Sequence, residues 1–159
     1  MNTEKKIFSS DNSKTTVIIR LMVGAIFLSE GIQKFLYPMA LGPGRFEKIG
    51  FIHPEFWGNF VGIFEILCGA AILIGFFTRA AAIAMLIEMS VSILITKIPI
   101  IYGQSILGFN LPHVNMYNFW SFAHEARTDF AMWMGSLFLL IKGGGCCSID
   151  RRLSKQKTK

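Results

Sequence analysis

Three ionisable side chains inside apolar stretches of the sequence are the first candidates for chemistry. Glu30 and Lys34 lie four residues apart in the stretch 16–37, and Glu65 lies in the stretch 56–77. Because a charge in an apolar stretch needs a partner, we expect Lys34 to meet both carboxyl groups. Burial and like charge both raise the pKa of a carboxyl group, so one acid could hold a proton near neutral pH. The group could then relay protons or hydrogen-bond a quinone or another polar headgroup; the alternative is an ion pair that only fixes helix register.

The positions of small and charged residues predict that two helices hold these side chains. In the first stretch, one helical stripe contains Arg20, Gly24, Phe27, Gly31 and Lys34. In the second stretch, a similar stripe contains Gly58, Gly62, Glu65 and Gly69. The pattern Gly58-x-x-x-Gly62 allows another backbone to approach closely. The two helices could use this face to pack on each other, or a second copy of the chain could use it in a homodimer.

The composition predicts an all-α integral membrane protein, a four-helix bundle. Of 159 residues, 52% are hydrophobic and only 16% are charged, and apolar runs of about 20 residues can cross a bilayer as helices. The apolar segments are 16–37, 56–77, 80–101 and 128–142. The last is short unless its helix begins near Asn115. We expect one transmembrane domain at 15–142, a mobile polar N-terminus at 1–14 and a basic cytoplasmic tail at 143–159.

The distribution of basic residues predicts that both termini are cytoplasmic, since most of the 16 lysines and arginines then lie on that side. The basic tail is expected to contact the lipid bilayer.

The net charge of +6 does not indicate a nucleic-acid partner, because no recognition module accompanies it. The three cysteines are not spaced as a disulfide framework or a zinc site. A secretory signal peptide is a competing interpretation of the first segment, but charges interrupt that segment and no clear cleavage site follows it.

Other polar residues are secondary candidates. Glu88, in the third segment, is counted at about 12 Å from the inner boundary of the membrane. We therefore do not expect it to meet Glu65 directly unless a polar channel links them, and we expect Ser92 or Arg20 to satisfy it.

The segment 102–126 is long and rich in aromatic residues, which is typical of an interfacial belt or of a cover over a functional site. Here and at the start of the fourth helix lie His113, His124, Arg127 and Asp129. They lack the spacing of a metal site, so no metal is expected. The sequence contains no nucleophile motif, and no catalytic residue is assigned.

Several short motifs occur in a characteristic order between about residues 18 and 153. They are Arg20-x-x-x-Gly24-x-x-Phe27-x-x-x-Gly31-x-x-Lys34, Gly50-Phe51 with Pro54, Glu65-x-x-x-Gly69, Gly75-Phe76-Phe77-Thr78-Arg79, and Gly143-x-Gly145-x-x-Ser148-Ile149-Asp150. This ordered set resembles the DoxX family of small four-helix membrane proteins. Arg20, Lys34 and Glu65 match the family pattern, whereas His113 and His124 match no pattern of the family.

The resemblance implies a multi-pass protein of the bacterial inner membrane. The family is named for a subunit associated with quinone-linked thiosulfate oxidation, and similar proteins accompany oxidative-stress enzymes or occur in metallophore gene clusters. Distant relatives resemble cargo receptors and assembly chaperones of eukaryotic membranes. The family therefore implies the fold more firmly than any one reaction.

Two hypotheses follow. The preferred one is an inner-membrane subunit of a redox system, at most the membrane subunit of a quinone-linked oxidoreductase. It would contact quinone or a proton pathway through an outer-leaflet pocket around Glu30, Lys34 and Glu65, and would work with a soluble or membrane redox partner. The alternative is a non-catalytic assembly, chaperone or cargo-binding protein in which the same charges only hold the helices together.

Overall fold

The computed structural model of the chain describes residues 13–156, and over this range it contains helices and no strands. Residues 1–12 of the expected mobile N-terminus and residues 157–159 of the expected tail lie outside this range. The helices are α2 (Thr15–Leu36), α3 (Pro43–Ile49), α4 (Pro54–Ile74), α5 (Thr78–Ser92), η1 (Ile93–Lys97), α6 (Ile98–Tyr102), α7 (Phe119–Lys142) and α8 (Ile149–Gln156).

Three helical stretches are long and apolar enough to cross a membrane: Thr16–Leu36, Pro54–Ile74 and Thr78–Tyr102. This confirms the expected all-α membrane protein in its general form. α7 begins at Phe119, well upstream of residue 128, and it carries several charged residues in its first half. A fourth membrane crossing by α7 and the cytoplasmic position of both termini stay predictions.

Two of the segments that join or follow the long helices are more ordered than the sequence interpretation allowed. The prolines and glycines of residues 38–55 predict an outer loop, but residues 43–49 form α3, which has a proline in its first turn and ends at Gly50 in the left-handed conformation. These are ordinary start and stop signals of a helix. After α7, residues 149–156 form α8.

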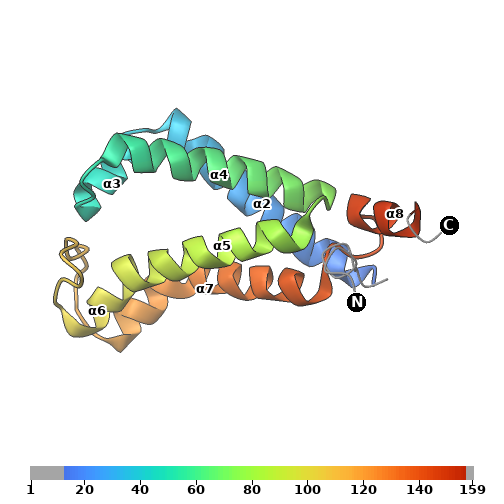
Figure 1. Cartoon of the computed structure of the whole chain (residues 1–159). Helices are drawn as coiled ribbons and strands as arrows, with labels where there is room; N and C mark the ends of the chain where they lie inside the picture. The colour runs from blue at the N-terminus through green and yellow to red at the C-terminus, as the bar shows by residue number, and fades with distance from the viewer. Residues whose placement is uncertain (1–12, 157–159) are drawn as a thin grey trace.

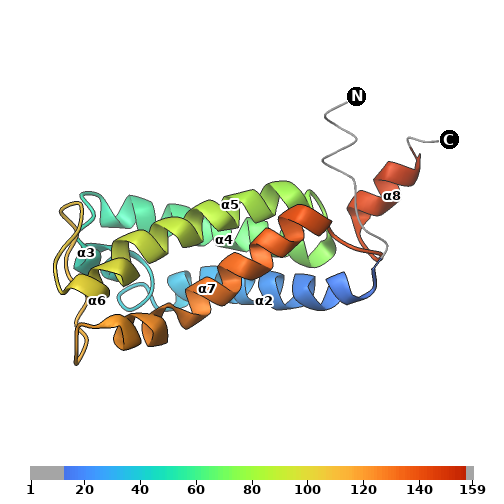
Figure 2. The ribbon, with the colours of Figure 1, turned by 90° about the horizontal axis from the view of Figure 1, so that it is seen from below.

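The long helices form two antiparallel pairs. α2 packs along α4, and α5 packs along α7. The pairs meet near the turn from α4 to α5 and diverge towards the end that carries α3 and α6 (Figure 1). The start of α2 and helix α8 lie together at the closed end, and α7 crosses the molecule obliquely from the α2 side to the α5 side (Figure 2).

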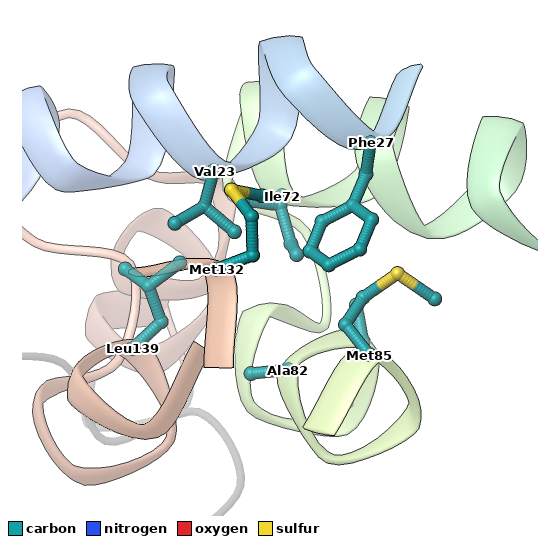
Figure 3. Packing of buried hydrophobic residues seen from close by; sticks show 8 residues of the cluster. Val23, Phe27, Ile72, Ala82, Met85, Met132 and Leu139 are labelled. Atoms are coloured by element: carbon teal, nitrogen blue, oxygen red, sulfur yellow. The ribbon is translucent and has the colours of Figure 1, made fainter. Parts of the chain in front are cut away.

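Buried apolar side chains join the two pairs at the closed end. The core includes Val23 and Phe27 of α2, Ile72 of α4, Ala82 and Met85 of α5, and Met132 and Leu139 of α7 (Figure 3). Met85 and Met132 fill the space between helices of different pairs, as flexible thioether side chains commonly do. This core holds the two helix pairs together at the closed end, and it does not extend to the end that carries α3 and α6.

Glycines allow α2 and α4 to lie in close contact. A Cβ atom on Gly31 would lie 2.7 Å from the carbonyl oxygen of Gly62, and one on Gly69 would lie 2.5 Å from the backbone nitrogen of Leu28. A Cβ atom on Gly58 would likewise lie 2.6 Å from the backbone nitrogen of Pro43. The Gly58-x-x-x-Gly62 face is therefore used within the chain, against α2 and α3, and is not free for a homodimer.

Gly31→Ala is expected to lower the free energy of unfolding by about 1–3 kcal/mol, because the added methyl group must separate two backbones. Thermal unfolding of the detergent-solubilised protein, followed by circular dichroism, measures the effect. Ala25→Val is the matched control, since it adds a larger group to the exposed side of the same helix. Equal losses of stability in the two variants would contradict the close contact of α2 with α4.

The third long stretch contains one π-helical turn. η1 lies between α5 and α6, and the backbone N–H of Ile98 donates to the carbonyl of Ile93. Pro99, which has no N–H to donate, follows in the first turn of α6 and is buried. Single π turns inside α-helices are frequent at functional sites. This one ends at Lys97, which faces α7.

Candidate functional site

A cavity of about 670 Å³ lies between the α2–α4 pair and the α5–α7 pair. Its volume is typical of sites that hold a small organic molecule. The lining carboxyl groups belong to Glu30, Glu65, Glu88, Glu125 and Asp129. The lining cations belong to Lys34, Arg45, Lys97 and Arg127. Much of the remaining surface is apolar, so the cavity suits a ligand with a polar group on an apolar body.

Lys34 and Glu65 form an ion pair at the wall of this cavity. The Nζ atom of Lys34 donates to Oε2 of Glu65 at 2.5 Å, and the two residues are only 8% and 2% exposed. Both residues lie on the stripes that bring α2 and α4 together, and the glycines Gly31 and Gly62 bring their backbones close. The geometry thus depends directly on the glycine contacts of the two helices.

Glu30 lines the same cavity and is half-buried. It does not pair with Lys34: within residues 13–156, Lys34 forms its salt bridge with Glu65 alone. The expected ion pair between Glu30 and Lys34 is therefore absent, because the Lys34 ammonium binds Glu65 of α4 instead. Glu30 is left as a carboxyl group facing the cavity from the α2 wall.

Glu88 lies beside Glu65, contrary to the expectation that the two are separate. Among charged groups, Glu65 has the strongest electrostatic interaction with the Glu88 carboxyl group, and Lys34 and Glu30 interact with it more weakly. Ser92 and Arg20 do not satisfy it: the Ser92 hydroxyl donates to Asp129, and Arg20 donates to backbone carbonyls in the 143–148 loop. The Oε2 atom of Glu88 is buried and has no hydrogen-bond partner among the described residues.

The expectation about Glu88 was wrong because depth was counted from two presumed membrane boundaries. α4 and α5 are joined by a tight turn, so height is better counted from that turn. Glu65 lies ten residues before Gly75, and Glu88 lies ten residues after Thr78. At about 1.5 Å per residue, both carboxyl groups are at the same height in the hairpin.

The site thus contains two adjacent carboxyl groups and one ammonium group. Lys34 balances the charge of Glu65. An ionised Glu88 would add a second negative charge beside Glu65 without a cation of its own, which is costly away from water. The Lys34–Glu65 pair is therefore balanced, whereas Glu88 is a buried carboxyl group that forms no salt bridge with the described residues.

A second polar group lies on the opposite wall. Asp129 of α7 accepts a hydrogen bond from the Ser92 hydroxyl at 2.8 Å, and its Oδ2 atom lies 3.6 Å from Nζ of Lys97. Arg127 lines the same wall and donates to the backbone carbonyl of His124. α5, η1 and α7 are therefore joined by side chains that face the cavity.

The two histidines do not join this group. His113 lines a separate, smaller cavity, and His124 is exposed. Among the residues that the structure describes, no group of three His, Cys, Asp or Glu side chains is arranged to hold a metal ion.

Arg20 lies outside the cavity and closes the opposite end of the molecule. Its guanidinium donates to the carbonyls of Gly144 at 2.6 Å and Cys147 at 3.1 Å. In the same region, the Asp150 carboxylate accepts hydrogen bonds from the backbone N–H groups of Phe77 and Thr78, at 2.7 and 2.9 Å. These contacts tie the loop after α7 to α2 and to the start of α5, so Arg20 has a structural role.

Cys146 and Cys147 lie in the loop whose carbonyls bind Arg20. Their Sγ atoms lie 3.4 Å apart. The hydrogen bond with the Cys147 thiol, together with desolvation, raises the pKa of the Cys146 thiol. A thiol with a raised pKa is less reactive at neutral pH.

Sequence reasoning missed the aromatic wall of the cavity and the cation Arg45. Trp57, Phe60 and Phe64 line the cavity from α4. Their spacing of three or four residues was visible in the sequence as one helical face. Arg45 was missed because its segment was interpreted as a loop.

Comparison with known proteins agrees with the membrane character of the chain. The sequence model of the DoxX family matches residues 15–98. An uncharacterized membrane protein of Mycobacterium tuberculosis, Rv3486, is 44% identical over 153 residues, an alignment that covers 96% of this chain and 90% of that protein. No solved structure matches the chain. The extent of both matches shows that the chain belongs to the DoxX family of membrane proteins.

Proposed function

We propose that this protein is a membrane subunit of a redox system, and that its main cavity binds the headgroup of a quinone or quinol. The observation that carries the proposal is the Lys34–Glu65 ion pair with Glu88 beside it, at the wall of a cavity of about 670 Å³. The ligand must offer hydrogen-bonding oxygens to the charged wall and an apolar body to the rest. A quinone meets both requirements.

In this proposal the aromatic and charged walls have different tasks. The quinone ring lies against Phe60 and Phe64 of α4, whose own rings are stacked at a centroid distance of 5.6 Å. A quinone carbonyl oxygen accepts a hydrogen bond from Lys34, which lines the same cavity. The aromatic wall holds the ring, and the ion pair orients it.

The carboxyl groups exchange protons with the bound ligand. Reduction of a quinone to a quinol consumes two electrons and two protons, and oxidation returns them. We assign the first proton to Glu88, which lies beside the Glu65 carboxylate, and the second to uptake through Asp129, while a partner oxidoreductase supplies or takes up the electrons. Asp129 lines the same cavity and is the group through which protons pass to and from the open end.

The proposal includes an orientation in the membrane. α7 is taken as the fourth crossing, because its Asp129 is paired with Lys97 and is therefore not exposed to lipid as a free charge. The closed end is formed by the start of α5, the end of α7 and α8 (Figure 1), and these parts of the chain contain Arg79, Lys142, Arg151 and Arg152. Placing this end in the cytoplasm follows the positive-inside rule and puts the cavity in the outer half of the bilayer.

Glu88→Gln tests the role of the carboxyl pair. The variant is expected to fold normally, because glutamine is similar in size and Glu88 forms no salt bridge within residues 13–156. It is expected to slow quinone-dependent electron transfer by about 100-fold, since a positioned acid or base typically contributes this much. Electron transfer is measured in membranes of a deletion strain that expresses each variant. Glu47→Gln is the control, because Glu47 is exposed and does not line the cavity.

Binding is tested separately with decylubiquinone, a short-chain quinone. Saturable quenching of tryptophan fluorescence in the purified protein, lost in Trp57→Phe, would support a quinone in the main cavity. Absence of binding, together with unchanged electron transfer in the deletion strain, would exclude the redox role. Co-purification of a client protein in that case would favour the assembly or cargo-binding function.

A further inference from the structure

A second cavity, of about 220 Å³, adjoins the open end of the first. It is formed by α3, by the η1–α6 stretch and by residues 110–114. The two cavities share the lining residues Arg45, Ile49, Thr96, Lys97 and Glu125. This vestibule therefore lies at the mouth of the main cavity, at the end of the molecule opposite the start of α2.

The vestibule contains three cations, two of which form no salt bridge with any residue that the structure describes. Arg45 and Lys48 lie three residues apart on α3 and face the same side of that helix. Neither forms a salt bridge with any residue in the range 13–156. Lys97, the third cation, is 3.6 Å from Asp129. Glu125 is the one carboxylate among the lining residues, so positive charge is in excess.

Hydrogen bonds hold the walls of the vestibule together. The Asn110 side chain donates to the Lys48 carbonyl at 2.9 Å, and the Asn110 backbone N–H donates to the Ile49 carbonyl at 2.8 Å. Next to them, the rings of Phe51 and Phe109 are in contact, with centroids 4.9 Å apart. Residues 109 and 110 are therefore fixed to α3 and to the residues that follow it, and this part of the wall is held in place by the protein's own contacts.

We propose that this vestibule binds a phosphate-type oxyanion, supplied by the headgroup of an anionic phospholipid or by free phosphate. An arginine guanidinium without a protein partner can bind a phosphate with two parallel hydrogen bonds, and a nearby lysine adds a point charge. The side chains of Asn110 and His113 add further polar groups to the wall. This site adjoins the proposed quinone site and shares lining residues with it, but it does not depend on the proposed redox role.

The test is a calorimetric titration of the full-length protein in a neutral detergent. The probes are dihexanoyl phosphatidylglycerol, dihexanoyl phosphatidylcholine and inorganic phosphate. Saturable binding of the phosphatidylglycerol, with much weaker binding of the zwitterionic phosphatidylcholine, would support a lipid headgroup site. Saturable binding of inorganic phosphate, with the same dependence on the variants below, would support free phosphate as the source.

The variants separate a built site from general surface charge. Arg45→Gln and Lys48→Gln are each expected to weaken binding about tenfold, the usual effect of losing a charged hydrogen bond. Glu125→Gln is expected to strengthen binding, because it removes the opposing negative charge. Arg152→Gln removes an exposed charge from α8, at the other end of the molecule, and is expected to have no effect.

Folding of each variant is checked by circular dichroism and gel filtration, and Arg45→Lys provides a second variant that keeps the charge. We expect Arg45→Lys to bind more tightly than Arg45→Gln. The proposal is overturned if no probe binds saturably, or if Arg152→Gln weakens binding as much as Arg45→Gln does.

Discussion

Lys34→Met is expected to destabilise the protein by about 3–5 kcal/mol, the usual cost of removing one member of a buried ion pair. The Glu65 carboxylate, 2% exposed, would lose the ammonium that donates to it at 2.5 Å. Its second neighbour, Glu88, has the same charge type and cannot replace the lysine. The loss is measured from the midpoint of thermal unfolding in detergent, followed by circular dichroism.

The double variant Lys34→Met/Glu65→Met is the control for this experiment. Replacing both members of a buried ion pair by apolar residues is often neutral or stabilising, so the double variant is expected to recover most of the lost stability. If it also remains folded but no longer binds quinone, the ion pair serves binding rather than folding. An unchanged midpoint in Lys34→Met alone would show that the contact carries no energy.

Arg20→Met is expected to lower the free energy of unfolding by about 2–4 kcal/mol, because it removes two hydrogen bonds from a charged donor. The carbonyls of Gly144 and Cys147 would lose their guanidinium partner. The loop 143–148 would then be held mainly through Asp150 of α8, whose carboxylate accepts hydrogen bonds from the backbone N–H groups of Phe77 and Thr78. Arg152→Met is the control, since Arg152 is exposed on α8.

Limited proteolysis gives the local measurement for Arg20→Met. Faster cleavage within residues 143–148, with the cavity end unaffected, would indicate that Arg20 secures the closed end only. If the variant instead lost decylubiquinone binding with the loop still protected, Arg20 would have to act on the cavity, contrary to its position.

The contact of Lys34 with Glu65 could be predicted from the sequence because helical periodicity alone shows which face of each helix carries the charged residue. The stripes in 16–37 and 56–77 place glycines and charges on the same faces, and such faces must meet when lipid surrounds the rest. The contact of Glu65 with Glu88 required a second variable, the register of the α4–α5 hairpin. That register follows from the position of the turn at Gly75 and was available in the sequence.

Other parts of the site could not be obtained from periodicity. The volume of the cavity follows from the divergence of the two helix pairs, which depends on packing at the closed end. The vestibule depends on where the chain from 103 to 118 returns over α3, and that path is fixed by long-range contacts such as Asn110 with Lys48. The segment of α3 was predicted to be a loop; Pro43 and Gly50 are helix start and stop signals that could have indicated the helix, but not its packing partner.

The π turn at 93–97 has a consequence for the evolution of this fold. Compared with a regular α-helix, a π turn accommodates about one extra residue per turn, and one residue corresponds to about 100° of rotation. Deleting a single residue within Ile93–Lys97 would restore α-helical geometry and keep a membrane-length segment. Because the π turn already absorbs that residue, the helices on either side would keep their facing, and Lys97 would stay close to Asp129. Homologous chains that are one residue shorter here would therefore share both the scaffold and the charged entrance, and would differ only in the local width of the helix.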